Sequence, residues 1–403
     1  MASRLTQLRL VAGDSWRLLR CHGAAGLGRR VLRSAYQRWC PDDLSFPLRP
    51  GELVSAEQVP RAVAASSQRS EPLTIGWVTV PPGRGSGGHT TMFRVIEALE
   101  RAGHTCVLYV YDRYEGDLRR RESVVRSWWP QIRAELRDIH DGVNGVDALV
   151  ATSWETAHLA ARHAASVRRC FYFVQDFEPY FYPQGSEYAF AEDTYRFGFH
   201  GLTAGRWLST ILSDRYGMSC DWFEFGADTD VYCNLGAGRD RDGVVFYAKP
   251  SVPRRGYQLG VESLLEFSRR HPKAPIHLFG HPVQDLPFAM TSHGSLTPAQ
   301  LNDLYNTCRV GLSLSFTNVS LIPWELLASG VVPVVNDADH NRIVLDSDRV
   351  SWAAPTITGL ADAMSSAYER YSTEIGNACS SSVAAASWAD AGAAMVAAIE
   401  REL

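Results

Sequence analysis

The sequence lacks several features that would assign it to a familiar class. No stretch approaches the ~18 uncharged apolar residues that a membrane-spanning helix needs. The eight cysteines are scattered without a C-x-x-C pair, which argues against a zinc site or a redox dithiol. The formal net charge is only −4 over 403 residues, so we expect no nucleic-acid partner. Scattered thiols in a chain of this size fit a reducing compartment, and we expect a cytoplasmic protein.

The chain also shows little sign of metal binding. Asp228-Thr229-Asp230 looks like a D-x-D pattern, and such a pair holds a divalent metal on a diphosphate in some sugar transferases. It lies in a seam rich in Gly, Asp and Arg, where a turn or interdomain packing explains it better. No cluster of His, Cys and Glu has ligand spacing elsewhere, so we predict no metal.

Residues 1–39 differ from the rest of the chain. They carry eight arginines and one acid, Asp14, with apolar residues at helical spacing. This basic arm could lie on an anionic membrane surface, which would make the protein peripheral at the inner face of a bacterial membrane. It also resembles an Arg-rich transit peptide. The alternatives are a helix packed on the body with a solvated basic face, or a contact with a partner enzyme.

Short β-rich runs alternate with helical patterns from Thr74 onward, and this alternation restarts after a seam near 227–242. The runs that predict strands are TIGWVTV (74–80), CVLYVYD (106–112), DALVATSW (147–154), CFYFVQDFE (170–178), HGLTAG (200–205), CDWFEFG (220–226), VVFYAKP (244–250), APIHLFG (274–280), RVGLSLSF (309–316) and VVPVVND (331–337). Strand–helix alternation predicts parallel, doubly wound sheets. We therefore expect an α/β chain with two Rossmann-like domains.

We divide the chain into four parts. Residues 1–70 form a basic, helical extension and linker, 71–235 the first Rossmann-like domain, and 236–382 the second. Residues 383–403 form a strong terminal helix.

A glycine-rich loop follows the first predicted strand. It reads Gly83-x-Gly85-x-x-Gly88 before a helix, which places backbone N–H groups where a phosphate could bind. His89 stands where an ATP-binding loop has lysine, so we discount ATP. A dinucleotide site remains open, because Asp112 ends the next strand where a ribose-binding acid belongs. A tight turn with close helix packing is the structural alternative.

Two stretches of the second domain carry more specific chemistry. Lys249, Arg254 and Arg255 follow a strand, and three cations at the carboxyl edge of a sheet suit a diphosphate whose bond is breaking. A solvated basic loop is the alternative. Glu325 lies in the first turn of a later helix, where a carboxylate can accept both hydroxyls of a ribose, although it could also serve only as a helix cap. The loop before it offers further polar groups for phosphate and sugar: Thr317, Asn318 and Ser320.

From Thr74 to its C-terminus the chain resembles a GT-B glycosyltransferase of family 4. The segment from Gly294 through Tyr305 to Val335, with PWELLASGVVPVV, follows the family's final-domain pattern. In this register the second glutamate of the family's E-x7-E motif, which holds the ribose, is Glu325. The resemblance implies that Lys249 and Arg255 bind the diphosphate, that Gly87 and Gly88 face it from the first domain, and that Asp228-Thr229 belongs to the interdomain linker.

The same resemblance implies a division of labour. The first domain would bind the acceptor, the second the nucleotide-sugar donor, and the terminal helix would pack back on the first domain. Retention of configuration follows, without a metal or any cofactor beyond the donor.

One position departs from the family pattern. The first glutamate of E-x7-E, which contacts the transferred sugar, falls on Thr317. A neutral hydroxyl there suggests a different sugar, such as one lacking a hydroxyl. The segments FYFVQDFEPYFYPQ, FYAKPSVPRRGYQLG and LSLSFTNVSLIPWELLASG are similar to rhamnosyltransferases of the WsaF type, which implies a dTDP-L-rhamnose donor and a growing bacterial surface glycan, free or lipid-linked, as acceptor.

The acceptor side is predicted from the stretch VQDFEPYFY. Asp176, at the carboxyl end of a strand, is the candidate to orient or deprotonate the acceptor hydroxyl, and a turn or helix cap is its structural alternative. Glu178, Tyr180 and Tyr182 are candidates to line the acceptor groove. His158 and His89 are weaker candidates. A catalytically silent glycan- or nucleotide-binding protein on the same fold is the alternative function.

Overall fold

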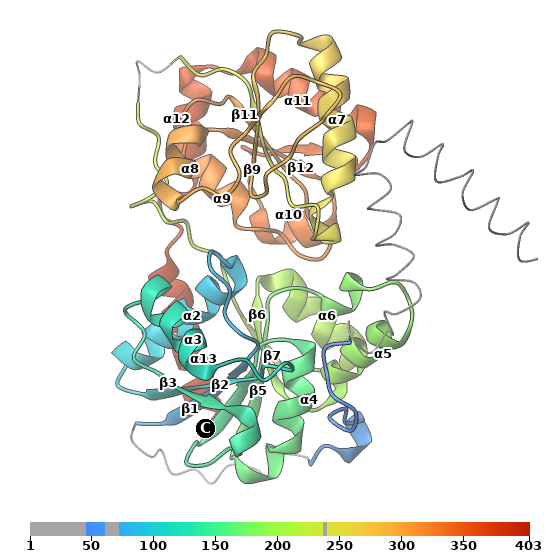
Figure 1. Cartoon of the computed structure of the whole chain (residues 1–403). Coiled ribbons are helices and arrows are strands. Elements are labelled where there is room, and N and C mark those ends of the chain that lie inside the picture. The colour runs from blue at the N-terminus through green and yellow to red at the C-terminus, as the bar shows by residue number, and fades with distance from the viewer. Residues whose placement is uncertain (1–45, 61–71, 237–239) are drawn as a thin grey trace, which may run out of the picture. The chain divides into compact units, whose positions relative to one another are not determined.

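The computed structural model describes residues 46–60, 72–236 and 240–403 (Figure 1). The basic arm predicted at residues 1–39, with its possible membrane or enzyme contacts, lies outside these ranges, as does most of the linker. Within them the prediction of two parallel, Rossmann-like sheets is confirmed.

The first sheet has seven parallel strands in the order β3-β2-β1-β4-β5-β6-β7. Their bounds are β1 (Thr74–Thr79), β2 (Thr105–Val110), β3 (Glu135–Asp138), β4 (Ala148–Ala151), β5 (Arg169–Val174), β6 (His200–Ala204) and β7 (Cys220–Phe223). The helices between them are α2 (Gly87–Arg101), α3 (Leu118–Trp128), α4 (Trp154–Arg162), α5 (Ser186–Asp193) and α6 (Arg206–Tyr216). Strand β3 was not predicted, because its sequence ELRD is polar.

The second sheet has six parallel strands in the order β10-β9-β8-β11-β12-β13. Their bounds are β8 (Val244–Tyr247), β9 (Ile276–Phe279), β10 (Thr291–Ser292), β11 (Val310–Ser313), β12 (Val332–Asn336) and β13 (Ser351–Ala353). The helices are α7 (Tyr257–Arg270), α8 (Pro298–Tyr305), α9 (Ile322–Ala328), α10 (Asp339–Leu345), α11 (Ile357–Arg370) and α12 (Thr373–Ser382). The short edge strands β10 and β13 were not predicted.

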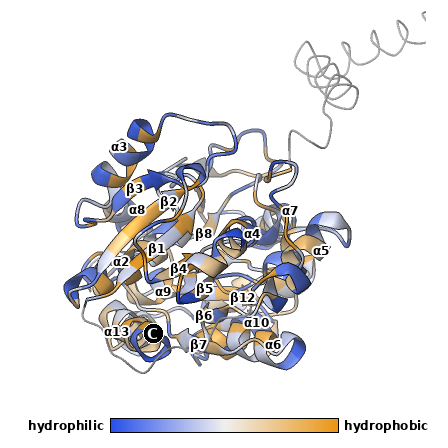
Figure 2. Ribbon diagram, turned by 90° about the horizontal axis from the view of Figure 1, so that it is seen from below, coloured by the Kyte–Doolittle hydropathy of each residue, from blue (hydrophilic) through white to orange (hydrophobic). Residues whose placement is uncertain are grey.

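Each sheet is the centre of a hydrophobic core. In the first, the ring of Phe173 stacks on Phe223 at 5.6 Å and meets the edge of Trp77 at 5.7 Å, and all three side chains are buried. Aromatic pairs of this kind contribute about 0.5–1.5 kcal/mol beyond their buried area. Figure 2 shows the hydrophobic residues gathered along the strands, whereas α3 is mostly hydrophilic.

The terminal helix α13 (Trp388–Glu402) belongs spatially to the first domain. It packs on α2 and β7, and Figure 1 shows it in red among the elements of the first sheet. The fit is close, because a Cβ added at Gly392 would lie 2.7 Å from the Ala98 Cβ. The carboxylate of Glu402 pairs with Arg169 at 2.9 Å.

Candidate functional site

The glycine loop leads directly into α2. Ser86 caps this helix, and its side chain accepts a hydrogen bond from the His89 amide. A Cβ at Gly87 would meet no heavy atom within 4 Å, and one at Gly88 would meet only the Gln175 carboxamide, at 3.5 Å. Neither residue has a positive φ, unlike Gly85 at +67°. Neither backbone strain nor close packing therefore requires glycine at 87 and 88, so their bare, exposed backbone leaves room for a ligand at a helix N-terminus.

The groups that favoured a dinucleotide or histidine chemistry in this region have local partners. The Asp112 carboxylate accepts two bonds from Arg121, at 2.7 and 3.2 Å, and one from the Tyr114 amide at 3.0 Å. Burial opposes ionisation of this group, but the Arg121 and backbone bonds outweigh it and lower its pKa. The His89 ring lies 2.8 Å from the Ser86 hydroxyl, and burial lowers the pKa of His89. Asp112 is therefore engaged by its own domain rather than open to a ribose.

The basic edge predicted after β8 is present. Arg254 Nε lies 3.6 Å from Asp176 Oδ2, and its guanidinium covers the Phe181 ring at 4.4 Å. Arg255 Nη1 donates to the Ser315 hydroxyl at 2.5 Å. Burial lowers the pKa of Arg255, and Asp176 partly offsets this effect. The partly buried Lys249 has no carboxylate partner among the described residues. Three cations therefore follow β8 and one of them, Arg254, approaches a carboxylate, which leaves this edge positive and suited to a diphosphate.

Asp176 follows β5 and meets the loop that follows β11. Thr317 Oγ1 donates to Asp176 Oδ1 at 2.7 Å, and the Phe177 amide donates to the Thr317 carbonyl at 3.2 Å. Thr317 is 1% exposed and the Asp176 side chain 16% exposed. Asp176, the candidate to orient the acceptor, is therefore in direct contact with Thr317, the residue that stands where the family has its sugar-contacting glutamate.

Asn318 has a different surrounding from the one predicted. Its Nδ2 donates to the Gln175 carbonyl at 2.8 Å and to the Ala204 carbonyl at 3.0 Å, and the residue is fully buried. Both donors are used on the first domain, so in this structure the carboxamide N–H groups do not face a donor sugar. Ser320 is also buried, with its hydroxyl 3.3 Å from that of Ser313.

The predicted acceptor-groove residues separate into two groups. Glu178 is only 4% exposed, and its Oε2 accepts from the Trp154 amide at the start of α4 at 2.6 Å. Burial raises the pKa of Glu178 well above its ordinary value. The structure thus places Glu178 beneath the surface as a helix cap, because the first amides of α4 need an acceptor.

The other residues predicted on the acceptor side are two tyrosines, Tyr180 and Tyr182, and one histidine, His158. Tyr180 is 44% exposed, so its ring is available for stacking on a sugar. Tyr182 is partly buried, and its hydroxyl accepts from Trp154 Nε1 at 3.1 Å. His158 is buried: its Nδ1 lies 3.1 Å from the Val54 amide and its Nε2 3.3 Å from the Phe190 carbonyl. Burial lowers the pKa of His158 to about 4, which gives it a structural role.

Glu325 lies in the first turn of α9 with one hydrogen-bond donor. Tyr305 Oη donates to its Oε2 at 3.1 Å. Burial raises the pKa of Glu325 to about 7, although the Tyr305 bond acts in the opposite direction. Asp228 also raises this pKa and Arg94 lowers it. The carboxylate is thus positioned by Tyr305 with one oxygen, Oε1, left for another partner.

The Asp228-Thr229-Asp230 stretch forms a turn with packing contacts. The Asp228 carbonyl accepts from the Val231 and Tyr232 amides at 2.9 and 2.7 Å, and its carboxylate pairs with Arg94 of α2. Asp228 therefore has a structural partner. In the three described ranges, no group of three or more His, Cys, Asp and Glu side chains could hold a metal ion.

Two residues that were not predicted from the sequence contact the candidate site residues. Tyr305 positions Glu325, and Gln175 Nε2 donates to the Gly88 carbonyl at 3.1 Å. Gln175 stands directly before Asp176 in the strand-ending stretch already singled out, so its place was a usable signal. Tyr305 lies at a buried position of α8, and the sequence pattern predicts only a core residue there.

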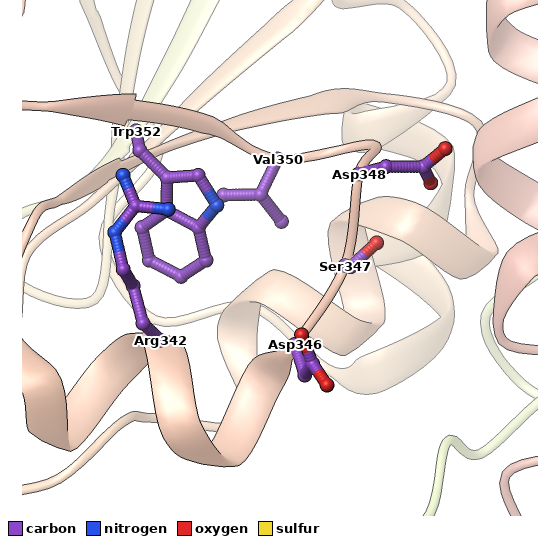
Figure 3. A pocket seen from close by; sticks show the side chains of 6 residues that line it. All are labelled: Arg342, Asp346, Ser347, Asp348, Val350 and Trp352. Atoms are coloured by element: carbon purple, nitrogen blue, oxygen red, sulfur yellow. The ribbon is translucent and has the colours of Figure 1, made fainter.

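A cavity of about 380 Å³ lies apart from these residues, on α10 and β13 (Figure 3). Arg342 and Trp352 form one side of it, with the guanidinium 4.8 Å from the ring centroid. Arg342 also pairs with Asp337. The remaining lining residues are Asp346, Ser347, Asp348 and Val350, and no predicted site residue contributes to it.

The chain is similar to known proteins over both domains. Residues 133–203 match the N-terminal domain of the WsaF family and residues 242–365 its C-terminal domain. The O-antigen biosynthesis protein RfbC of Myxococcus xanthus is 29% identical over 352 residues, which cover 83% of this chain and 27% of that protein. The chain thus spans about a quarter of that relative.

Solved structures share the fold at low sequence identity. HepE of Anabaena, in complex with UDP and glucose, has a TM-score of 0.62 at 15% identity, covering 82% of this chain and 98% of that chain. Sucrose-phosphate synthase of Thermosynechococcus elongatus has a TM-score of 0.60 at 11% identity, with the same coverage. No helix in the described ranges is both long and apolar enough to cross a membrane. The chain is thus similar to both WsaF domains, which follow each other on two parallel Rossmann-like sheets, and it has the GT-B fold of glycosyltransferases.

Proposed function

We propose that this protein transfers a sugar, L-rhamnose or another 6-deoxy sugar, from a dTDP donor to a growing bacterial surface glycan, with retention of configuration and without a metal. The observation that carries this proposal is the approach of Arg254, from the loop after β8, to Asp176, from the loop after β5, with Lys249 and Arg255 as two further cations after β8. A site for breaking a sugar–diphosphate bond needs positive charge for the leaving group and an acid–base group for the acceptor.

The donor would be held mainly by the second domain. Glu325 would accept the ribose hydroxyls through its free oxygen, while Tyr305 fixes the carboxyl group. Lys249 and Arg255 would bind the diphosphate, with the Gly87 and Gly88 amides at the start of α2 as further donors. Each well-placed group of this kind contributes about 3–4 kcal/mol to the transition state.

In the reaction, the bond between the anomeric carbon and the diphosphate oxygen breaks while negative charge builds on the leaving group. The anomeric carbon gains oxocarbenium-ion character, and the acceptor oxygen forms the new bond. The acceptor proton would pass to Asp176 or be oriented by it. Tyr180 would contact the acceptor with its exposed ring.

The choice of a 6-deoxy sugar is supported by Thr317. Threonine has no carboxylate to offer to a sugar hydroxyl at this position, and its own hydroxyl donates to Asp176. Similarity to the WsaF domains and to an O-antigen biosynthesis protein supports the surface-glycan acceptor. The metal-free mechanism is supported by Asp228, whose carboxylate pairs with Arg94, and by the cations that take a metal's place.

The test is a transfer assay with purified protein, an oligosaccharide acceptor and the donors dTDP-L-rhamnose, UDP-glucose and GDP-mannose, with and without EDTA. We expect turnover with dTDP-L-rhamnose, unchanged by EDTA, and an anomeric configuration that matches the donor by NMR. Turnover with UDP-glucose alone would discard the deoxy-sugar assignment. Nucleotide binding without transfer or donor hydrolysis would favour the catalytically silent alternative.

A further inference from the structure

Three consecutive residues of the first domain are hydrogen-bonded to two consecutive residues of the second. The Gln175 carbonyl accepts from Asn318, the Asp176 carboxylate from Thr317, and the Phe177 amide donates to Thr317. Thr317 and Asn318 are 1% and 0% exposed. We call this set of bonds, residues 175–177 with 317–318, the junction. Its burial shows that it is a packed element and not a surface encounter.

Asn318 makes the most demanding contact of the junction. Its single Nδ2 supplies both N–H groups to two carbonyls, Gln175 at 2.8 Å and Ala204 at 3.0 Å. These carbonyls follow or end the neighbouring strands β5 and β6, at the carboxyl edge of the first sheet. A buried carbonyl without a donor costs free energy, so each needs one. Aspartate has the same shape but no donor, and it would place a carboxylate against two carbonyl oxygens.

Gln175 extends the junction to the glycine loop. Its backbone carbonyl accepts from Asn318, while its side-chain Nε2 donates to the Gly88 carbonyl at 3.1 Å. One residue therefore contacts the first turn of α2 and the loop after β11. Because both the backbone carbonyl and the side chain of Gln175 are hydrogen-bonded, the backbone directly before Asp176 is held in place.

We propose that Gln175 and Asn318 are positioning residues that align Asp176 with the groups holding the diphosphate. This inference rests on the proposed function. Asn318 sets the carbonyl before Asp176 relative to the second domain, and Gln175 sets it relative to the α2 N-terminus. Because a misplacement of about 1 Å can cost roughly 100-fold in rate, loss of either bond set is expected to impair attack by the acceptor more than binding of the donor.

The experiment compares Gln175→Met and Asn318→Asp with wild type. Three quantities are measured: the Kd of the donor nucleotide diphosphate, the rate of transfer to the acceptor, and the rate of donor hydrolysis by water without acceptor. We expect the Kd to change less than about threefold, transfer to fall about 10- to 100-fold, and hydrolysis to fall less. The ratio of transfer to hydrolysis therefore drops, which general loss of folded protein would not cause.

Asn306→Asp is the matched control. Asn306 is buried, and its Nδ2 donates to two carbonyls, Cys233 and Asn302, at 2.9 Å each, neither of which belongs to the junction. It should lower thermal stability but leave the transfer-to-hydrolysis ratio at the wild-type value. If Asn318→Asp does not fold, Gln175→Met, at a partly exposed position, decides the question. An unchanged ratio in Gln175→Met overturns the proposal, whereas a wild-type protein without transfer or hydrolysis overturns the proposed function instead.

Discussion

The hydroxyl of Thr317 donates to the carboxylate of Asp176 over 2.7 Å, from the loop after β11 to the loop after β5. Arg254 approaches the other oxygen of the same carboxylate at 3.6 Å. The first domain thus contributes the acid of the candidate site, and the second contributes the cations and the hydroxyl that orient it. This division matches an acceptor group on one domain and a leaving-group site on the other.

Replacing Thr317 by valine removes this bond while keeping the side-chain shape. A hydrogen bond to a charged group contributes about 1.5–3 kcal/mol, so we expect turnover to fall about 10- to 100-fold, measured as initial transfer rate at saturating donor. Thr194→Val is the control, because it removes a buried hydroxyl that donates to the Ala191 carbonyl within the first domain. Equal losses in both variants would show that the Thr317 effect is structural.

Gly88→Ala separates a ligand role from a folding role. The added methyl group would meet only the Gln175 carboxamide at ordinary contact distance, and alanine favours a helix over glycine by about 0.5–1 kcal/mol. We expect an unchanged or higher melting temperature together with weaker binding of the donor nucleotide, measured by calorimetric titration. A lower melting temperature with unchanged nucleotide binding would show that Gly88 serves packing and not ligand binding.

The raised pKa of Glu325 predicts a pH-dependent stability. Because its value of about 7 in the folded protein exceeds the ordinary 4.5 of the unfolded chain, the folded state holds this proton longer. Stability is therefore lost as the pH rises from about 4.5 to 7. Glu325→Gln cannot ionise, so its melting temperature should match wild type at pH 4.5 and exceed it at pH 8. A constant difference across this range would contradict the raised pKa of Glu325.

Arg255→Met tests whether the charge of Arg255 serves the reaction although it lowers the stability of the folded protein. Burial lowers the pKa of Arg255, which shows that its environment disfavours the charged form. We expect the variant to melt at the same or a higher temperature while transfer falls roughly 100- to 1,000-fold. Arg269→Met is the control, because Arg269 is 66% exposed and should change neither quantity. Loss of both stability and activity in Arg255→Met would assign the residue to the core.

Much of the fold could be predicted because parallel strands buried on both faces are short apolar runs. Strands such as β1 and β5 have this pattern, and the helices after them end at charged residues, Arg101 and Asp193. Strands β3, β10 and β13 lie at or next to sheet edges, where burial imposes less hydrophobicity. Their polar or very short sequences therefore carried no strand signal.

The site was predictable only in part, for a related reason. Two candidate residues follow a strand, Lys249 and Arg255, and one lies in the first turn of a helix, Glu325. Their place in the chain was enough to predict that they lie at the carboxyl edge of the second sheet. The partners of Asn318 and Thr317 are at least 114 residues away in the chain, and no local pattern encodes them. Glu178 looked like a groove residue, because the need of the Trp154 amide for an acceptor becomes visible only in three dimensions.

The most direct test of the proposed donor site is nucleotide binding by wild type and Glu325→Ala. Purified protein is heated with dTDP, UDP, GDP or NAD, without magnesium, and the melting temperature is recorded. A ligand at a hundredfold excess over its Kd stabilises the folded state by about 2.7 kcal/mol, so a true donor nucleotide is visible. We expect a selective shift with dTDP that is lost in Glu325→Ala. A shift with NAD alone, or no shift with any nucleoside diphosphate, would contradict it.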